Sequence, residues 1–347
     1  MAKEKSKNSI KRTWLVVLVV ILSLILLLLL GGLALVYGVL SSFQRPEDVE
    51  QTLPQAEMES ILQQENDVSE DFSGPVLESN DVQILPADVV IEDTENIFRI
   101  MLLGVDNRST QYRSRTDAMI LCTINRSAKT LTMTSFMRDT YVYIPEFYQQ
   151  RLNVAYPVGG FGTLYDTLEY NFGVQVDKGV AVNFSSFQEV VDAIGGVDIV
   201  LTGAEAAYLN HGSGWWLQKG VNHLTGEQAL AYSRIREIDS DYNRTNRQRN
   251  VMSAIIQKAQ TLSVKELIRL VKVLMPMVVT DMSNKEIIDA AVALAPILKD
   301  ITIVTQRIPV DDGHTMAMVD GMSVLIPDLE VNRQYLIDTI GLGEDGN

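Results

Sequence analysis

The hydrophobic residues of the chain follow two different patterns, of which the first is one uncharged apolar run over residues 15–40. This run is longer than the roughly 20 residues that a helix needs to span a bilayer, and longer than the about 7–15 apolar residues of a cleavable signal peptide. No clear small-residue cleavage site follows it. We therefore expect a retained signal anchor, a single transmembrane helix over residues 14–40.

Basic residues flank this span unequally. Five of them precede it and only Arg45 follows it closely; the five are Lys3, Lys5, Lys7, Lys11 and Arg12. Positively charged flanks stay in the cytoplasm. The sequence therefore predicts a single-pass protein of the cell membrane, with a cytoplasmic basic tail over residues 1–13 and an extracellular C-terminal part.

The second pattern begins near residue 96, where short apolar segments alternate with amphipathic ones. Enrichment in β-branched residues predicts strands over 96–106, 117–126, 130–137, 178–184, 197–201 and 301–309. Apolar spacing, a serine cap at the 185–196 segment and glycine stops predict helices over 161–173, 185–196, 264–276, 284–298 and 330–340. Two capping boxes, Thr225 with Gln228 and Thr245 with Gln248, predict two further helix starts. Alternating strands and helices predict one α/β domain over residues 97–343, a mixed central sheet flanked by helices.

Charge is distributed unevenly. Residues 46–98 contain fifteen Asp or Glu and no Lys or Arg, a charge equal to the net −15 of the whole chain. We expect residues 41–96 to form a solvated acidic stalk. The single cysteine, Cys122, lies in an apolar strand segment and is expected to be a small core side chain.

Two aspartates stand at the ends of predicted strands. Asp106 ends the first strand and Asp117 begins the next. Strand ends at one edge of an α/β sheet are a common place for ligand sites, and two carboxylates there suit Mg²⁺ together with phosphate oxygens and water. Ordinary turn chemistry is the alternative, because Asp is common at strand ends.

Several arginines lie close to these aspartates or to helix starts. Arg138 follows a strand, and Arg234 and Arg236 are spaced to lie on one side of an extended segment. Arg244 and Gln248 share a helix face, just after Asp241. Arginine binds phosphate oxygens in a bidentate manner and helix N-termini attract anions, so converging arginines indicate a pyrophosphate site. The alternative is a solvated, salt-bridged surface.

Other kinds of site are not supported by the motifs present. The three histidines, His211, His223 and His314, are widely spaced, which disfavours a histidine-based zinc site. The extracellular part has no G-x-S-x-G, P-loop or dinucleotide fingerprint.

Six ordered motifs resemble those of the LytR-CpsA-Psr family over residues 97–260. They are LLGVDNR, RTDAMILCTIN, SFMRDTYVYIP, RLNVAYPVGG, FSSFQEVVDAIGGVDI and LTGEQALAYSRIRE followed by RQRNV. The resemblance implies an extracytoplasmic ligase of the Gram-positive envelope. Such a ligase transfers a glycopolymer from an undecaprenyl-pyrophosphate carrier to peptidoglycan and forms a phosphodiester. It also implies an apolar pocket for the polyprenyl chain, which VVDAI and VMSAII would line unless they are core.

The resemblance also implies roles for individual positions. Asp106 and Asp117 would hold Mg²⁺, and Gln248 and Arg115 would complete or border the substrate site. Among the catalytic residues, Arg138, Arg234, Arg236 and Arg244 would grip the pyrophosphate, and Asp241 would complete that site. SFMRD stands where SIPRD is commoner in the family, and RLNVAY where KINAAY is commoner.

Three other functions compete with the ligase. A transcriptional attenuator, which the family's historic name suggests, is disfavoured because residues 99–347 carry a net −5 and a tail of about a dozen residues is too short for a DNA-binding fold. We therefore expect no nucleic-acid partner. A polyprenyl-pyrophosphate-binding scaffold and a pyrophosphatase remain open.

Overall fold

The computed structural model describes residues 72, 74–91, 96–105, 113–263, 266, 278–294 and 296–341. The expected tail (1–13), anchor (14–40), most of the stalk (41–96) and the helix expected over 264–276 therefore lie outside the described residues. Within the described part of the chain, no helix is long and apolar enough to cross a membrane.

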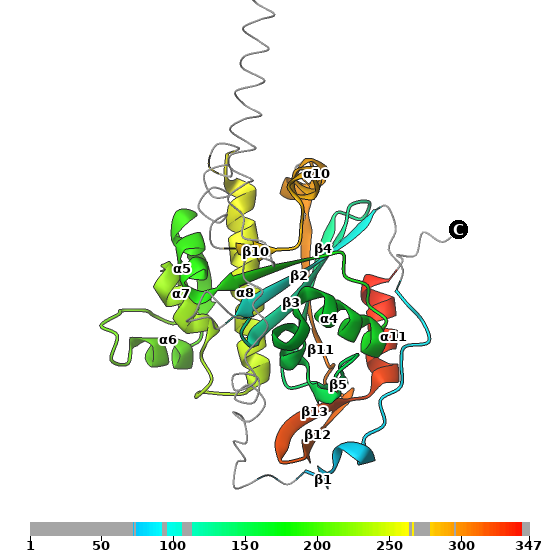
Figure 1. Ribbon diagram of the computed structural model, residues 1–347. Helices are drawn as coiled ribbons and strands as arrows, with labels where there is room; N and C mark the ends of the chain where they lie inside the picture. The colour runs from blue at the N-terminus through cyan, green and yellow to red at the C-terminus, as the bar shows by residue number, and fades with distance from the viewer. Residues whose placement is uncertain are drawn as a thin grey trace, which may run out of the picture. The chain divides into compact units, whose positions relative to one another are not determined.

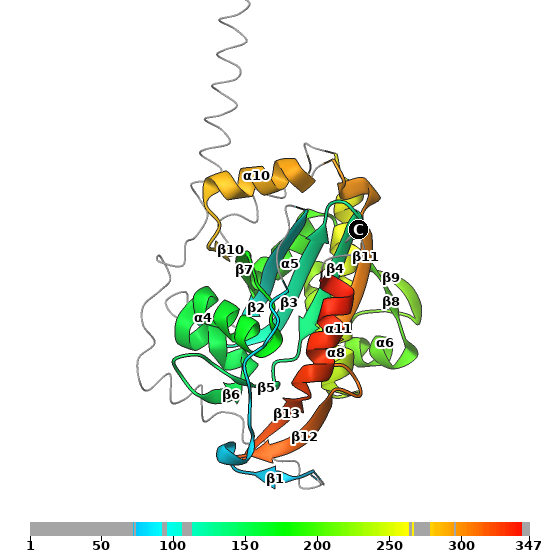
Figure 2. The same ribbon diagram turned by 90° about the vertical axis from the view of Figure 1, so that its right-hand side faces the viewer.

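A six-stranded mixed sheet forms the centre of the domain, in the order β10-β7-β2-β3-β4-β11 (Figures 1 and 2). Its strands are β10 (Val278–Thr280), β7 (Lys178–Asn183), β2 (Ile97–Val105), β3 (Thr116–Asn125), β4 (Thr130–Phe136) and β11 (Thr302–Ile308). The pairs β2–β7 and β4–β11 are parallel, whereas β2–β3, β3–β4 and β7–β10 are antiparallel. The predicted mixed central sheet is confirmed.

Helices cover both faces of the sheet, which explains why its inner strands read as continuous apolar runs. On one face lie α5 (Phe184–Ala193), α7 (Gly226–Ser233) and α8 (Asp241–Thr261); on the other lie α4 (Ala155–Phe172) and α11 (Leu329–Ile340), as Figure 1 shows. Met252 of α8 packs on a cluster that includes Cys122 and Met133 of the sheet. Cys122 is 6% exposed, as expected of a core residue.

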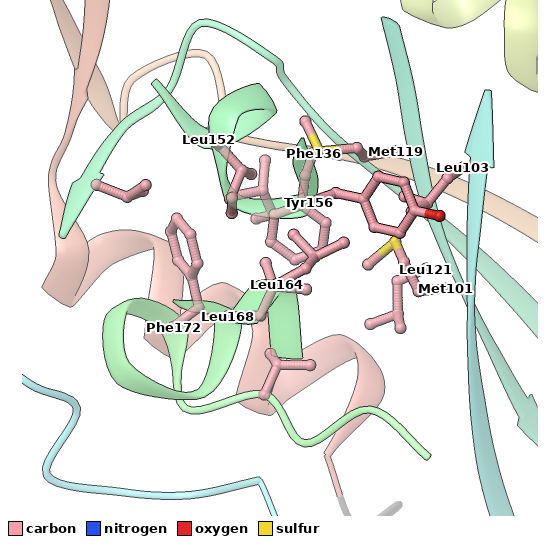
Figure 3. Close-up of a cluster of buried hydrophobic side chains, with 14 of the residues drawn as sticks. Met101, Leu103, Met119, Leu121, Phe136, Leu152, Tyr156, Leu164, Leu168 and Phe172 are labelled. Carbon is pink, nitrogen blue, oxygen red and sulfur yellow. The ribbon is translucent and has the colours of Figure 1, made fainter. Parts of the chain in front are cut away.

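The opposite face carries the larger core. Figure 3 shows Leu164 and Leu168 of α4 directed toward Met101 and Leu121 of the sheet, with Tyr156 at the start of the helix between them. All of these side chains except Tyr156 are fully buried. Gly173 caps α4 in the left-handed conformation (φ 70°), as its sequence position predicts.

A second, separate core lies beside α5, α7 and α8. It is closed by the hairpin β8 (Val197–Leu201) with β9 (Gly220–Leu224), and by α6 (Gly203–Asn210). β8 alternates strictly between buried and exposed residues, so its inward positions feed this core. α10 (Asn284–Leu294) follows β10 at the sheet edge, as Figure 2 shows.

The C-terminal part adds elements for which no strand was expected. The hairpin β12 (His314–Val319) with β13 (Met322–Pro327) pairs with β1 (Val76–Leu77), and two short strands, β5 (Tyr141–Tyr143) and β6 (Gln149–Arg151), lie nearby. Val82 is buried against this hairpin, and Ile91 bridges to Val174. Residues 74–91, which the sequence analysis assigned to the stalk, therefore pack on the domain, because their few apolar side chains find a hydrophobic surface there.

Three helix starts differ from the sequence expectation. α8 begins at Asp241 with Ser240 as its cap, so the predicted capping box at Thr245 is wrong; the Thr245 hydroxyl instead donates to the carbonyl of Tyr242 inside the helix. Asn183 rather than a serine caps α5. α4 begins earlier than residue 161, at Ala155, and is interrupted at Gly160 (φ 72°). The box of Thr225 with Gln228 is confirmed.

Candidate functional site: an arginine-lined cavity

A cavity of about 880 Å³ lies between the sheet and the helices α5, α7 and α8. Seven of the nine residues predicted for the site line it: Arg115, Asp117, Arg138, Arg234, Arg236, Arg244 and Gln248. Asp241 contacts the cavity wall through Arg244. Asp106 lies outside the described residues. Strand ends and one helix start thus bring together residues that are up to 133 positions apart in the chain.

The loop between α7 and α8 presents two of these arginines on the same side. Ile235 is fully buried, whereas Arg234 and Arg236 on either side of it are exposed. The segment is a turn and not the extended segment that was expected, because Arg234 is the C-cap of α7 in a helical conformation (φ −104°, ψ −1°). The guanidinium of Arg234 also lies 4.4 Å from the ring centroid of Phe184, another cavity residue, which limits where it can point.

Asp117 is the centre of a second group. Its Oδ1 accepts from Nη1 of Arg138 at 3.1 Å and from Nη2 of Arg236 at 3.5 Å. Arg138 Nε also lies 3.5 Å from Asp139 Oδ2. The carboxylate therefore joins the end of β4, the start of β3 and the arginine loop at one point.

Arg244 is the most deeply buried cation of the cavity, at 1% exposed. Its Nη2 contacts both oxygens of Asp241, at 2.9 and 3.0 Å. Among the described residues, Nε and Nη1 have no hydrogen-bond partner. Burial lowers the pKa of Arg244 to about 10, against the opposing effect of Asp241, so the side chain stays a cation at neutral pH. Buried donors without acceptors are costly, and an anion in the cavity would satisfy them.

Arg247, three residues further along α8, does not line the cavity. It contacts the loop between α7 and α8, which carries Arg234 and Arg236. Its Nε donates to Glu205 and its Nη1 donates to the carbonyl of Ile235 and to Asp239. Burial alone would lower the pKa of Arg247, but hydrogen bonds with Asp239 and Glu205 outweigh burial and raise it. Arg247 was not predicted as a site residue. Its position in the sequence, relative to Arg244 and Gln248, indicates only that it lies on another face of α8.

The sequence analysis also missed Arg113, Ser114 and Asn183, which line the cavity. Arg113 and Arg115 flank Ser114 just ahead of β3, and this i,i+2 pair repeats the pattern of Arg234 and Arg236. That repetition is the signal that could have identified Arg113. Asn183 is recognisable only as a helix cap, which gives no sign of its position at the cavity.

The far side of the cavity is apolar. The lining there includes Val180, Phe187, Val190, Leu230, Met252 and Ile255. The two segments expected either to line a pocket or to be core do both: Val190 and Ile255 line the cavity, whereas Val191 and Val251 are fully buried in the second core. Met252 and Ile255 follow Gln248 along α8, and Val180 lies three positions before Asn183 on β7, so the lining becomes apolar with distance from the strand ends near the arginines.

Asp117 is the described residue suited to hold a divalent cation. Both of its arginine contacts go to Oδ1, so Oδ2 carries no hydrogen bond from any described residue. Mg²⁺ sites often use one or two carboxylates and take their remaining oxygens from phosphate and water. Within the described ranges, no three Asp, Glu, His or Cys side chains cluster as a metal site. Asp117 thus fits a Mg²⁺ site in which the substrate supplies further oxygens.

A comparison with known families matches the LytR_cpsA_psr family over residues 54–336 of the chain. The chain belongs to the LytR-CpsA-Psr family. The matched range includes the cavity and residues 74–91, consistent with the packing of that segment on the domain. The resemblance drawn from the six sequence motifs is confirmed.

Relatives within the family carry a common description. TagT of Bacillus subtilis, a polyisoprenyl-teichoic acid–peptidoglycan teichoic acid transferase, is 38% identical over 173 residues, which cover 48% of this chain and 54% of that protein. TagV of the same organism, described in the same way, is 31% identical over 182 residues, covering 50% and 46%. The chain thus spans about half the length of these curated relatives in the matched region.

Solved structures of the family share the fold. TagT bound to LI-WTA superimposes with a TM-score of 0.60 at 27% identity, covering 77% of this chain and 100% of that chain. YwtF (TagT) with bound octaprenyl pyrophosphate lipid superimposes with a TM-score of 0.54 at 26% identity, with the same coverage.

Proposed function

We propose that the protein is a membrane-anchored phosphotransferase that moves a glycopolymer from undecaprenyl pyrophosphate to peptidoglycan during cell-wall assembly. The observation that carries this proposal is the two-ended cavity, which has at least five arginines at one end and an aliphatic lining at the other. A polyprenyl pyrophosphate has the same two-part character, a dianionic head on a long hydrocarbon tail. The relatives named as teichoic acid transferases, and the related structure with octaprenyl pyrophosphate, support it.

The chemistry is attack by a peptidoglycan hydroxyl on the phosphorus atom linked to the glycopolymer. A new P–O bond forms to the acceptor, and the bond to the bridging oxygen breaks. Undecaprenyl phosphate leaves with that electron pair, and the hydroxyl proton passes to a base. Phosphoryl transfer depends mainly on positioning and on neutralising charge on the phosphate oxygens.

The chain's own residues supply both. Arg234 and Arg236 would grip the exposed side of the pyrophosphate, and Arg138 the side next to Asp117. Arg244 would donate to the pyrophosphate through Nε and Nη1, which have no acceptor among the described residues. Asp241 keeps Arg244 oriented through its two contacts of 2.9 and 3.0 Å and is a candidate base. Arg115 and Gln248 complete the substrate side of the wall.

Magnesium fits this proposal at Asp117, with Asp106 as the expected second ligand. When bound, Mg²⁺ supplies positive charge to the phosphate oxygens. Around it, Arg138 and Arg236 hold the Asp117 carboxylate in place through Oδ1.

Function at the envelope also requires the localisation inferred from the N-terminal sequence. The anchor over residues 14–40, with a cytoplasmic tail and an extracellular domain, would tether the chain to the membrane that holds the lipid-linked donor. We propose this arrangement as part of the function.

The test incubates the full-length chain with a polyprenyl-pyrophosphate-linked saccharide and peptidoglycan, with Mg²⁺ or a chelator. Arg234→Ala is run beside Arg126→Ala, a matched arginine change at the opposite end of β3 from Asp117. A conjugate that requires Mg²⁺ and Arg234, but not Arg126, supports the ligase. Release of the free phosphosaccharide instead of a conjugate would make the protein a pyrophosphatase. Tight lipid binding without turnover, with several acceptors supplied, would make it a scaffold.

A further inference from the structure

A second cationic cluster lies at the β11 edge of the sheet, on a different face of α8 from the cavity. Tyr242, Asn246 and Arg249 follow one another at i, i+4 and i+7, so they share one face of this helix. Asp241, Arg244 and Gln248 lie on the neighbouring face, toward the cavity. The mechanism proposed above uses none of the three residues on the β11 side.

Arg249 is 7% exposed, and its charge has no counterion among the described residues. Its one hydrogen bond there is from Nη2 to Asn246 Oδ1, at 3.5 Å, and its Nε and Nη1 atoms are buried without partners. Burial first, and the nearby Arg307 second, lower the pKa of Arg249 to about 10. The side chain is therefore a buried cation at neutral pH, an arrangement that costs several kcal/mol unless something compensates it.

The surroundings of Arg249 provide more positive charge and a further hydroxyl donor. Arg307 of β11 lies 4.2 Å over the ring of Tyr242 and pairs with Asp311. Ser135 of β4 lies opposite Arg307 in the register of the two strands. Its side chain is 2% exposed, and its hydroxyl has no hydrogen-bond partner among the described residues. Neighbouring residues in register point to the same face of a sheet. Unmet donors from two side chains thus lie between α8 and the β4–β11 edge.

We propose that Arg249 forms a second oxyanion site, which binds one phosphate group at the β11 edge with the help of Ser135 and Arg307. A phosphate group has more acceptor oxygens than a carboxylate, so one ligand can satisfy donors from separate side chains. Asp311 already neutralises Arg307, so the excess charge is the single one of Arg249. A monoanionic phosphate or phosphodiester matches this charge.

The rim of the site is open to solvent. The Asp311 side chain is 90% exposed, and Asn246 is also exposed. A phosphate can approach by displacing the long contact between Asn246 and Arg249, after which the arginine exchanges an amide oxygen for an anionic one. The site goes beyond the proposed function, since it requires neither the pyrophosphate nor the acceptor.

The first experiment measures thermal unfolding of the full chain with and without inorganic phosphate. Arg249→Met removes the charge at similar length, Arg244→Met removes a donor from the main cavity, and Arg126→Met is the matched surface change. Phosphate can also enter the arginine-lined cavity, so we expect it to raise the Tm of the wild type and of Arg126→Met equally and that of Arg249→Met less. Arg244→Met should keep the part of the response that comes from the β11 edge. Without phosphate, Arg249→Met should be as stable as the wild type or more stable, because it removes an uncompensated buried charge.

An equal phosphate response in Arg249→Met would overturn the proposal, as would a lower Tm of that variant in phosphate-free buffer. If Arg249→Met does not fold, phosphorus NMR of inorganic phosphate with the wild-type chain decides. The main cavity is first saturated with a polyprenyl pyrophosphate, whose hydrocarbon tail directs it to the cavity with the apolar lining. Line broadening of inorganic phosphate that remains supports the site, whereas its absence refutes it. A parallel titration with a glycerol phosphodiester separates the two sources of the ligand: binding of both probes indicates a polymer phosphate, and binding of inorganic phosphate alone indicates free phosphate.

Discussion

Nε of Arg247 donates to Oε1 of Glu205 across 2.7 Å, with both side chains at least nine-tenths buried. The same guanidinium donates to the carbonyl of Ile235, the residue between Arg234 and Arg236. One buried ion pair therefore connects α6, α8 and the loop that carries two cavity arginines. The position of that loop depends on a side chain that does not line the cavity.

Replacing Arg247 should lower the stability of the fold. Arg247→Met leaves Glu205 buried without its partner, which we expect to cost about 3–5 kcal/mol of unfolding free energy. The double variant Arg247→Met/Glu205→Gln should recover most of that loss, because the glutamine carries no charge and still offers an oxygen to the α6 capping box with Thr202. Urea unfolding of the two variants and the wild type measures both values. A double variant no more stable than the single one would show that the ion pair is not the source of the effect.

Arg138 should matter for turnover far more than for folding. Arg138→Ala removes a cation beside Asp117 and is expected to lower the transfer rate by about 10²–10³, as for other charge-stabilising donors. Arg126→Ala serves as the control, since it changes an arginine at the far end of β3. Steady-state transfer rates with the lipid-linked donor compare the two, and equal losses would remove Arg138 from the site.

A pH dependence is expected from the contact between α10 and β7. Glu286 accepts from Lys178, at 2.9 Å, and from Ser283, and these bonds lower the pKa of Glu286 to about 2. A carboxyl with a depressed pKa stabilises the fold fully above its ordinary pKa of 4.5, and the stabilisation is lost as pH falls toward about 2. The ion pair is accessible to solvent, so its contribution to the free energy of unfolding is below about 1 kcal/mol.

Glu286→Gln tests this sign. The difference in unfolding free energy between the wild type and this variant should be largest near neutral pH and shrink between pH 4.5 and about 2. Urea unfolding across that range measures it. A difference independent of pH would assign the effect to packing and not to charge.

Cys122 should report on global unfolding. Burial raises the pKa of its thiol to about 12, so little reactive thiolate exists at neutral pH even where reagent can reach it. We expect a thiol reagent to label the native chain no faster than the chain unfolds. Labelling followed by mass spectrometry across a denaturant series measures this, and rapid modification of the folded protein would contradict it.

The sequence was most informative where one segment determines its own structure. The apolar runs in β2 and β3 predicted strands because helices cover both faces of the sheet, and β4 was recognisable by its β-branched threonines, which alternate with apolar residues. Some of the cavity arginines were predictable for a related reason: Arg115 and Arg138 stand at strand ends and Arg244 at a helix start, where an α/β fold brings ligand-binding groups together. Arg234 and Arg236 instead end α7 and follow it.

Elements that depend on distant partners were harder to predict. The apolar runs of β12 and β13 are only four and three residues long, and their strand structure depends on pairing with each other and with β1, more than two hundred positions earlier in the chain. The start of α8 was predicted at the wrong residue because Thr245 and Gln248 have the residue types of a capping box. Ser240, which caps the helix, has no Glu or Gln three residues later to mark it as a cap. The burial of the charged side chains of Arg247 and Arg249 likewise depends on residues that are distant in the sequence, so the local pattern does not predict it.

The pairing of β11 with β4 has a consequence for how the chain reaches this fold. Residues 302–308 lie parallel to residues 130–136, with most of the domain between them in sequence. Such non-local pairing slows folding, since the intervening loop must close before the contact forms. A chain that ends before residue 302 would keep β2, β3 and most of the cavity residues but leave β4 as an unprotected edge, open to pairing with another copy. The C-terminal segment therefore moves the edge of the sheet from the apolar strand β4 to β11, which carries the polar side chains Gln306 and Arg307.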